Sequence, residues 1–401
     1  MIESVAPTCQ ALAEELTPEP GAGIVTAMAM GHRPEVQTAG RPIVALDVSL
    51  LAGHVATALA RVPFRRPFTG VSSPWSNLGI TVTREVIRSF MGYSSSLRIP
   101  EFRSLELVLD DICKRIMPPI VRSLDVEGRH AEFGGVPGIL YMPRHQTPEG
   151  VVLYLHGGGY IGTSPTMYAF FTAQVCRQTG CAVFVADYRL APEFPYPAGA
   201  EDASAIYTAL LELGIPCERI FLAGDSGGGG LANTVLLEDA ETIDPVRPAG
   251  LLLFSPEVDL RLDEDSITDN ADHDILPWNI PTAAYLHGLD VTSSVVSPLS
   301  ADLNGFPPTC VTWGGDEMFR DPIRRYVDRL RAAGVQTDAR EFDGMFHVFQ
   351  ILMPWADNSR QVFRHVHQFM QRVLAEAPPL GSLDLVATLG LATAPPVPPS
   401  T

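Results

Sequence analysis

A serine set among glycines is the residue of this sequence best suited to chemistry. Ser226 lies in the stretch GDSGGGG, residues 224–230. Three kinds of site use such a stretch: a phosphate-binding loop, the nucleophile loop of a chymotrypsin-like protease, and the G-x-S-x-G elbow between a strand and a helix. A serine hydroxyl reacts well only beside a base that an acid orients, so the sequence must supply both partners.

Two of these sites do not fit the rest of the chain. A P-loop needs a Lys, and GDSGGGGLAN has none. The stretch GGGYIG, residues 157–162, matches a dinucleotide-binding loop, but Thr-Ser-Pro follows it where a helix should have begun. In chymotrypsin-like proteases the His and Asp precede the Ser, whereas the strong candidates here follow it. The elbow is therefore favoured.

The elbow has the sequence context that it requires. RIFLAGD before Ser226 is expected to be a strand, and GGGGLANTVLLEDA after it a helix. Gly224 and Gly228 flank the serine at positions where a Cβ would crowd the tight turn. Asp225 is expected to support the elbow. The helix N-terminus directs N–H groups at negative charge that develops on a substrate.

The base and the acid are sought after the serine, in the chain order that such elbows use. His347 lies in GMFHVFQ after the last predicted strand, and Asp316 follows the strand TCVTWGG. Glu317 and Asp321 are rival acids, but the position of Asp316 directly after the strand favours it. For each carboxylate the alternative is a role at a helix N-terminus.

Glycines after another strand provide the remaining part of the site. The apolar run VVLYL is followed by His156, Gly157, Gly158 and Gly159. Backbone N–H groups of such a loop join the N–H after the nucleophile in binding an oxyanion. We expect the donors to be Gly157, Gly158 and Gly227. His156 is expected to orient the loop without acting as a second base.

Short apolar runs separated by helical patterns must position these residues. Eight runs are expected to be strands: RSLDVEG, GILYMPR, VVLYLHG, CAVFVADY, RIFLAGDS, GLLLFSPE, TCVTWGG and TDAREFDG. From VVLYLHG onward they are nearly all apolar, which is typical of a parallel sheet covered by helices on both faces. Ligands bind at the carboxyl ends of such strands, and the candidate residues lie there.

Several motifs together resemble those of a known family. HGGGY, DYRLAPEFPYPAG, GDSGGG, SPEVDL, VSPL, GGDEMFRD and GMFHVFQ occur in family order over about residues 150–350. The chain is thus similar to the hormone-sensitive-lipase-like family of α/β-hydrolases. The resemblance implies an α/β-hydrolase fold, with a mostly parallel central sheet of about eight strands, helices on both faces and a helical lid. It also implies a triad of Ser226, Asp316 and His347 and short to medium acyl esters as substrates.

Two positions depart from that family. Gly227 follows the nucleophile where Ala is usual, which keeps the backbone N–H and is expected to preserve the chemistry. Glu257 stands after Ser-Pro where an aromatic residue is common. A carboxyl group there would change the shape and polarity of the substrate pocket.

The N-terminal part of the chain divides into an extension and a lid. Residues 1–75 are expected to be a partly disordered extension, in which 43–62 forms an amphipathic helix. That helix either packs on the body or contacts a membrane surface or a partner. Residues 76–121 are expected to be two lid helices, the second ending at Pro118-Pro119.

The catalytic domain is expected over residues 122–376, with a lid insertion at about 259–296. The acidic run DEDSITDNADHD, 263–274, looks like a calcium loop but lacks the Gly required at its sixth position. We therefore expect a solvated lid surface and no metal site. Residues 377–401, rich in Pro, Ala and Thr, are expected to be a tail.

The composition excludes some partners. The formal net charge is −18, so a nucleic-acid partner is not expected. The six Cys include no C-x-x-C and no His at zinc-ligand spacing. The N-terminus lacks a basic segment followed by an apolar run, and polar residues interrupt 43–62. Neither a signal peptide nor a membrane span is expected, and a cytoplasmic location follows.

The sequence therefore predicts a carboxylic-ester hydrolase that works through an acyl-enzyme with no metal or cofactor. Its expected partner is a small-molecule or lipid ester. Two alternatives stay open: an acyltransferase using the same acyl-enzyme, and a non-catalytic ligand-binding protein on the same fold. The sequence does not determine the natural ester or the oligomeric state.

Overall fold

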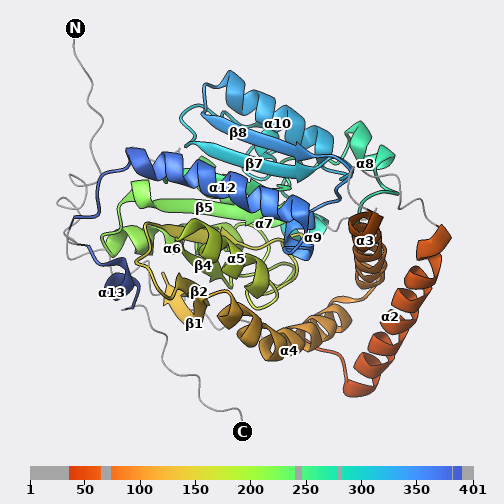
Figure 1. The fold of residues 1–401 in the computed structure, drawn as a ribbon. Helices are drawn as coiled ribbons and strands as arrows, with labels where there is room; N and C mark the ends of the chain where they lie inside the picture. The colour runs from red at the N-terminus through yellow and green to blue at the C-terminus, as the bar shows by residue number, and fades with distance from the viewer. Residues whose placement is uncertain (1–35, 65–73, 240–245, 278–281, 382, 391–401) are drawn as a thin grey trace.

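An eight-stranded sheet runs through the centre of the protein (Figure 1). The computed structural model describes residues 36–64, 74–239, 246–277, 282–381 and 383–390. The strands are β1 Val126–Phe133, β2 Val136–Pro143, β3 Val151–Leu155, β4 Ala182–Ala186, β5 Ile220–Asp225, β6 Gly250–Phe254, β7 Thr309–Gly314 and β8 Thr337–Phe342. β3 to β8 each fall within a predicted run, β2 begins two residues before its run, and β1 shares only residues 126–128 with the run 122–128.

Helices cover the sheet and extend beyond it. They are α2 Arg41–Arg61, α3 Pro74–Ser94, α4 Ile99–Ser123, α5 Ala169–Thr179, α6 Ala198–Glu212, α7 Ser226–Asp239, α8 Asp265–Asp269, α9 Thr282–Leu286, α10 Arg320–Ala332, α11 Phe349–Leu352, α12 Asp357–Glu376 and α13 Leu385–Gly390. Three short 3₁₀ turns join them: Val62–Phe64, Cys217–Arg219 and Pro298–Ser300.

The sheet is mostly parallel. Its strand order is β1-β2-β4-β3-β5-β6-β7-β8, with β2 antiparallel to both neighbours and every later pair parallel. All residues of β3, β4, β5, β6 and β7 are buried, as expected for strands covered on both faces. The predicted α/β-hydrolase fold is confirmed.

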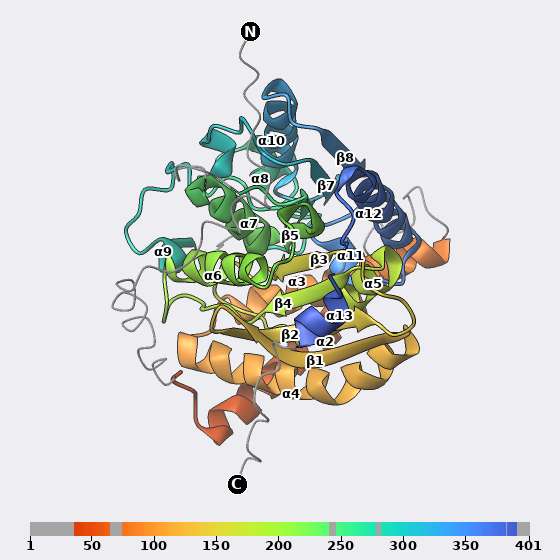
Figure 2. The ribbon, with the colours of Figure 1, turned by 90° about the vertical axis from the view of Figure 1, so that its left-hand side faces the viewer.

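Alternate residues of the strands supply two hydrophobic cores. In β3, Val152 and Tyr154 face one core, and the three residues that alternate with them face the other. Helices α5 and α12 close the first of these cores, and α6, α7 and α10 close the second on the opposite face (Figure 2). The carboxyl ends of the parallel strands are left for the loops that carry the site.

The second lid helix does not end at Pro118-Pro119, which corrects the sequence prediction. α4 continues through both prolines to Ser123. A proline inside a helix removes one N–H and crowds the preceding turn, which usually breaks the helix. Here Val121, in the last turn, is buried in the core that α5 and α12 close. Tertiary packing therefore outweighs the local signal.

Part of the predicted tail is folded, which is a second correction. In α13, Leu385 and Leu389 are completely buried against the core that α6, α7 and α10 close. Arg129 of β1 donates a 3.0 Å hydrogen bond to the carbonyl oxygen of Leu389. The composition pointed to a tail, but two Leu at helical spacing were the overlooked signal. Residues 391–401 lie outside the described residues.

The predicted helix 43–62 is α2, which packs on α3 and α4. Among the described residues, α2 is the one helix long and apolar enough, by length and composition, to cross a membrane. The helix does not turn an apolar face inward and a polar face outward as predicted. Its acidic residue, Asp47, is buried and accepts a 3.0 Å hydrogen bond from the Tyr93 hydroxyl, whereas several large apolar side chains are exposed. Residues 1–35 and 65–73 of the predicted extension lie outside the described residues, so the expected partial disorder stays a prediction.

Candidate active site

The elbow has the strained geometry that its glycines permit. β5 ends at Asp225 and α7 begins at Ser226, whose φ of 48° lies in the left-handed region that non-glycine residues rarely adopt. A Cβ on Gly224 would collide with the carbonyl of Gly228, and one on Gly228 with backbone carbonyls at the end of β3. Both positions therefore require glycine, and the tight turn lifts the serine hydroxyl from the end of the strand.

The structure brings His347 to this serine. Its Nε2 is 2.9 Å from Ser226 Oγ, and both side chains are buried. The histidine lies in the loop after β8, and its ring packs edge-on against Phe319. The distance is right for proton transfer from the hydroxyl to the imidazole.

Glu317 is the carboxylate that faces the imidazole. Its Oε1 is 3.8 Å from His347 Nδ1, and neither atom has a hydrogen-bond partner among the described residues. Glu317 Oε2 accepts hydrogen bonds from Ser255 Oγ (2.7 Å) and from the N–H of Gly314 (2.9 Å). Because buried polar atoms are normally paired, the two unpartnered atoms belong together, and a shift of about 1 Å would join them.

Asp316, the acid expected from the sequence, lies elsewhere. Its side chain is only partly buried. Burial raises its pKa, while the charges of His273, Arg84 and Arg320 oppose the rise. In the described part of the chain, no hydrogen bond or ion pair joins this carboxylate to His347. The expectation for Asp316 is therefore corrected to Glu317.

The turn after β7 explains the difference. The chain folds back directly after the strand, so that the N–H of Glu317 approaches the carbonyl of Gly314 at 3.4 Å. The second carboxylate of the turn, not the first, then points toward the base. The third candidate, Asp321, forms a 2.7 Å ion pair with Arg320 at the start of α10.

The charges around His347 favour its protonated form. Burial lowers the pKa of the imidazole, but the nearby carboxylate of Glu317 outweighs this effect. Asp274 and Asp225 add to the rise, so the net pKa lies above its usual value. An imidazolium formed here would be stabilised by its surroundings.

The loop after β3 can supply oxyanion donors, but not from every predicted residue. The N–H of Gly157 donates to Asp225 Oδ1 at 2.9 Å, so this donor is already used and the prediction for it is corrected. Within the described structure, the N–H groups of Gly158, Gly159 and Gly227 have no protein acceptor. Gly159, with a φ of 61°, was missed because the sequence does not show which N–H turns away.

Asp225 fixes the loop against the elbow. Besides Gly157, its carboxylate accepts hydrogen bonds from the hydroxyls of Tyr154 (2.7 Å) and Tyr168 (2.9 Å). Burial raises its pKa to about 6, although these hydrogen bonds lower it. One side chain thus joins β3, the glycine loop and the residue before α5 to the nucleophile.

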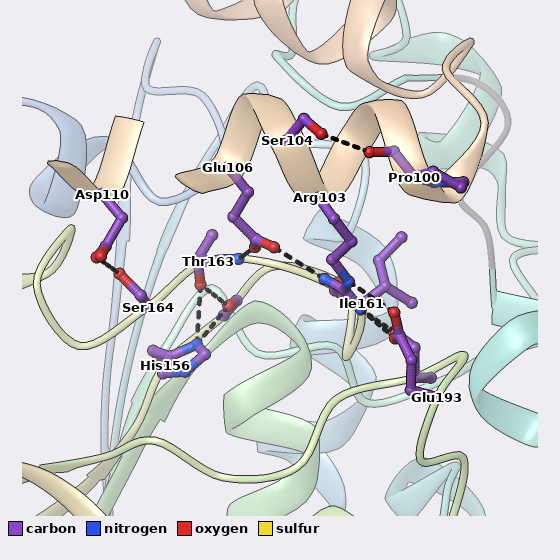
Figure 3. A network of polar contacts seen from close by, with 12 residues as sticks. Pro100, Arg103, Ser104, Glu106, Asp110, His156, Ile161, Thr163, Ser164 and Glu193 are labelled. Carbon is purple, nitrogen blue, oxygen red and sulfur yellow. Dashed lines mark hydrogen bonds and ion pairs between the residues drawn. The ribbon is translucent and has the colours of Figure 1, made fainter. Parts of the chain in front are cut away.

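His156 has the contacts of a structural residue. Its Nδ1 lies 2.9 Å from the carbonyl oxygen of Gly157 and 2.8 Å from Thr163 Oγ1 (Figure 3). The ring stacks on Tyr188 with centroids 4.5 Å apart. Complete burial lowers its pKa to about 4, so the ring is neutral at physiological pH.

Glu257 places a carboxyl group next to the nucleophile. Its N–H donates a 2.9 Å hydrogen bond to the carbonyl of Ser226, and the residue is 2% exposed. Oε1 has no hydrogen-bond partner among the described residues. Burial raises its pKa to about 7, which His347 opposes. A titratable group with an unpartnered oxygen therefore lies buried beside the nucleophile.

The acidic run offers a cluster with its own counter-charges. Asp259, Asp263 and Glu264 lie close enough together to hold a cation. However, Asp259 is paired with Arg261 at 2.5 Å, and Glu264 is paired with Arg325. Two of the three carboxylates, one of them buried, are thus already ion-paired.

Asp274, from the end of the same run, supports the base and was not found from the sequence. Its Oδ1 accepts the N–H of His347 (2.8 Å), and its Oδ2 accepts that of Met318 (2.7 Å). Arg88 of α3 donates to the Asp274 carbonyl at 3.2 Å. Only its place in an acidic run marks it in the sequence, and this does not distinguish it from its neighbours.

Known proteins share this architecture. A family model described as alpha/beta hydrolase fold matches residues 152–351. An acetyl-hydrolase of Streptomyces hygroscopicus is 34% identical, over 61% of this chain and 86% of that protein. An esterase of Acinetobacter venetianus is 30% identical, over 72% of this chain and 94% of its own length.

Solved structures agree with these relatives. The crystal structure of an esterase from the bacterial hormone-sensitive lipase family has a TM-score of 0.65 and 30% identity, covering 73% of this chain and 98% of that one. A hormone-sensitive lipase from a metagenome library also has a TM-score of 0.65, with 31% identity and coverage of 73% and 98%.

Proposed function

Because the chain belongs to the hormone-sensitive-lipase-like family of α/β-hydrolases and is an esterase-type enzyme, we propose that it hydrolyses carboxylic esters with a triad of Ser226, His347 and Glu317. The observation that carries this proposal is the 2.9 Å contact between His347 Nε2 and Ser226 Oγ at a strained elbow. The name of the acetyl-hydrolase relative supports short acyl groups as substrates.

The first half of the reaction forms the acyl-enzyme. Ser226 Oγ attacks the ester carbonyl carbon while its proton passes to His347 Nε2, and the carbonyl oxygen becomes an oxyanion. The N–H groups of Gly158, Gly159 and Gly227 are free to stabilise that charge. The carbon–oxygen bond to the alcohol then breaks, and the imidazolium returns its proton to the departing alkoxide. Glu317 stabilises the charged ring.

The second half releases the acid. Water gives a proton to His347 and attacks the acyl carbon, which forms a second oxyanion in the same donors. Collapse of this intermediate breaks the bond to Ser226 Oγ, and the imidazolium returns the proton to the serine. The enzyme is regenerated, with one carboxylic acid and one alcohol as products.

Ser226→Ala tests the nucleophile. We expect turnover of p-nitrophenyl butyrate and labelling by a fluorophosphonate probe both to be lost, with the circular dichroism spectrum unchanged, because the hydroxyl is the attacking group. Ser300→Ala, at an exposed serine, is the control and should behave as the wild type. Turnover by the Ser226→Ala protein at the wild-type rate would contradict the proposed mechanism.

We also infer that α2 rests on an anionic lipid surface. Most of its large apolar side chains are exposed: Leu46 is 57% exposed and Leu50 47% exposed. Its one acidic residue, Asp47, is turned inward. A helix that hides its acid and exposes its leucines suits an apolar medium better than water.

The charges near α2 favour lipid over a second copy of the chain. Arg41 and Arg61 stand at the two ends of the helix and are exposed. Two such helices side by side would bring like charges together, whereas anionic headgroups complement them. Trp75, at the start of the adjoining α3, is 83% exposed, and tryptophan favours membrane–water interfaces.

A further inference from the structure

The loop after β3 has positive φ angles at four residues, two of which are not glycine. Gly158 has a φ of 115° and Gly159 one of 61°, and two residues with a Cβ also have positive angles, Tyr160 at 63° and Thr163 at 73°. Left-handed backbone is unfavourable for residues other than glycine. The loop therefore depends on outside contacts to keep the conformation that frees its donors.

Lid helix α4 supplies such contacts (Figure 3). Arg103 Nη1 donates a 2.5 Å hydrogen bond to the carbonyl oxygen of Ile161 in the loop. Glu106 Oε1 accepts the N–H of Thr163, and its Oε2 accepts a 2.9 Å hydrogen bond from Arg103. Thr163 Oγ1 in turn donates to the carbonyl of Gly157 at 2.6 Å. A continuous chain of contacts thus runs from the lid to the first glycine of the loop.

The same network reaches the turn after β4. Arg103 is 5% exposed, and its Nε and Nη2 bind the two oxygens of Glu193 at 3.0 and 2.6 Å. Its Nη2 also donates to the carbonyl of Ala191 at 2.8 Å. Burial raises the pKa of Glu106, although Arg103 lowers it. Removing one partner of such a buried group leaves the others with unmatched charge.

Close packing accompanies the hydrogen bonds. A Cβ on Gly162 would meet the ring of Phe102 at 2.7 Å, so the loop lies directly on α4. Ser164 Oγ donates a 2.5 Å hydrogen bond to Asp110 Oδ1, one turn beyond Glu106. Since residues three and four apart lie on the same side of a helix, one face of α4 contacts the second half of the loop, residues 161–164.

We propose that Arg103 and Glu106 are positioning residues of the oxyanion hole, through which the lid helix sets the direction of the donor N–H groups. The proposal rests on the proposed function. Oxyanion donors act only when they already point at the place where charge develops. Without Glu106, the N–H of Thr163 loses its acceptor, and the turn that carries Gly158 and Gly159 loses one of its supports.

The test measures kcat and KM for p-nitrophenyl acetate and p-nitrophenyl octanoate in Glu106→Ala, Glu106→Gln and Arg103→Lys. We expect kcat to fall by about tenfold or more in Glu106→Ala for both esters, with KM little changed, because the lost interaction acts in the transition state. Glu106→Gln keeps an oxygen that can accept the Thr163 N–H, so it should lose less. In Arg103→Lys we expect kcat to fall, because an ammonium group cannot donate the several hydrogen bonds that the planar guanidinium makes.

Arg115→Ala is the matched control, since this arginine lies on α4 but forms an exposed pair with Asp111. It should keep wild-type kinetics. A loss confined to the octanoate ester, or a rise in KM with kcat unchanged, would show that α4 only shapes the acyl pocket and would overturn the proposal. A folded Glu106→Ala protein with the wild-type kcat would overturn the proposal as well. If Glu106→Ala does not fold, a wild-type kcat in both Glu106→Gln and Arg103→Lys would overturn it. The proposed esterase function is tested separately by the wild-type protein. Ester hydrolysis by the wild type would support that function whatever the variants do, and an inactive wild type would contradict it.

Discussion

At the scale of single residues, Glu257 makes stability depend on pH. Burial raises its pKa from 4.5 to about 7, so the folded state favours the neutral acid. As pH rises from 4.5 through 7, the free energy of unfolding falls by an amount on the order of 3 kcal/mol, because the unfolded state ionises first. Glu257→Gln removes this effect, so its gain in Tm over the wild type should be larger at pH 8 than at pH 5.

Thermal unfolding at both pH values checks this expectation. The exposed Glu212→Gln is the control and should change Tm equally little at pH 5 and pH 8. The same small change for Glu257→Gln at both values would show that the carboxyl of Glu257 finds a partner in solution.

The types of residue in the candidate site could be predicted from the sequence better than the directions in which their side chains and N–H groups point. The serine, the histidine and the glycine loop are marked by short motifs beside strand ends. Which of Asp316 and Glu317 faces the base depends on how one turn folds back over Gly314. Which glycine N–H is free depends on Asp225, whose carboxylate binds Gly157. Neither the orientation of the carboxylates after β7 nor that of the glycine N–H groups can be predicted from the spacing of residues in the sequence.

At the scale of elements, α2 gives a direct test of lipid contact. We expect the protein to cosediment with vesicles of phosphatidylcholine and phosphatidylglycerol, because apolar side chains and two arginines face outward. Leu46→Ser combined with Leu50→Ser should reduce the bound fraction several-fold. Val386→Ser, an exposed apolar residue on α13 at the other end of the molecule, is the matched control and should bind as the wild type (Figure 1).

Two outcomes would contradict the assignment of α2. One is sedimentation that the double variant leaves unchanged. The other is a dimer of the wild type in size-exclusion chromatography that the double variant converts to monomers, which would assign the helix to a second copy of the chain.

Element boundaries were predictable where hydrophobic patterning decides them. β3 to β7 fall within predicted runs, because buried parallel strands are almost continuously apolar. The antiparallel β1 and β2 extend beyond the runs predicted for them. The prolines of α4 and the composition near α13 misled the prediction, since both are local signals. Burial of Val121 and Leu389 in the cores overrides them, and such burial depends on residues far away in the chain.

At the scale of the whole molecule, the candidate site lies at the ends of neighbouring strands, and α4 contacts one of its loops. The glycine loop follows β3, Ser226 follows β5, Glu317 follows β7 and His347 follows β8. In the sheet these strands are neighbours except that β6 lies between β5 and β7. α4 reaches the glycine loop, and Arg88 of α3 reaches the segment that supports His347. The contact between Arg103 and Glu193 joins residues 90 apart, which no local pattern could predict.

The central claim is that Ser226, His347 and Glu317 act together, and two adjacent carboxylates allow a matched comparison. In the pH profile of kcat/KM for p-nitrophenyl acetate, Glu317→Gln should lower the plateau by about 100-fold or more. Because Glu317 raises the pKa of His347, the acidic limb should also move to lower pH. Asp316→Asn should keep both plateau and limb close to those of the wild type. A large loss in Asp316→Asn with near-normal activity in Glu317→Gln would contradict this account.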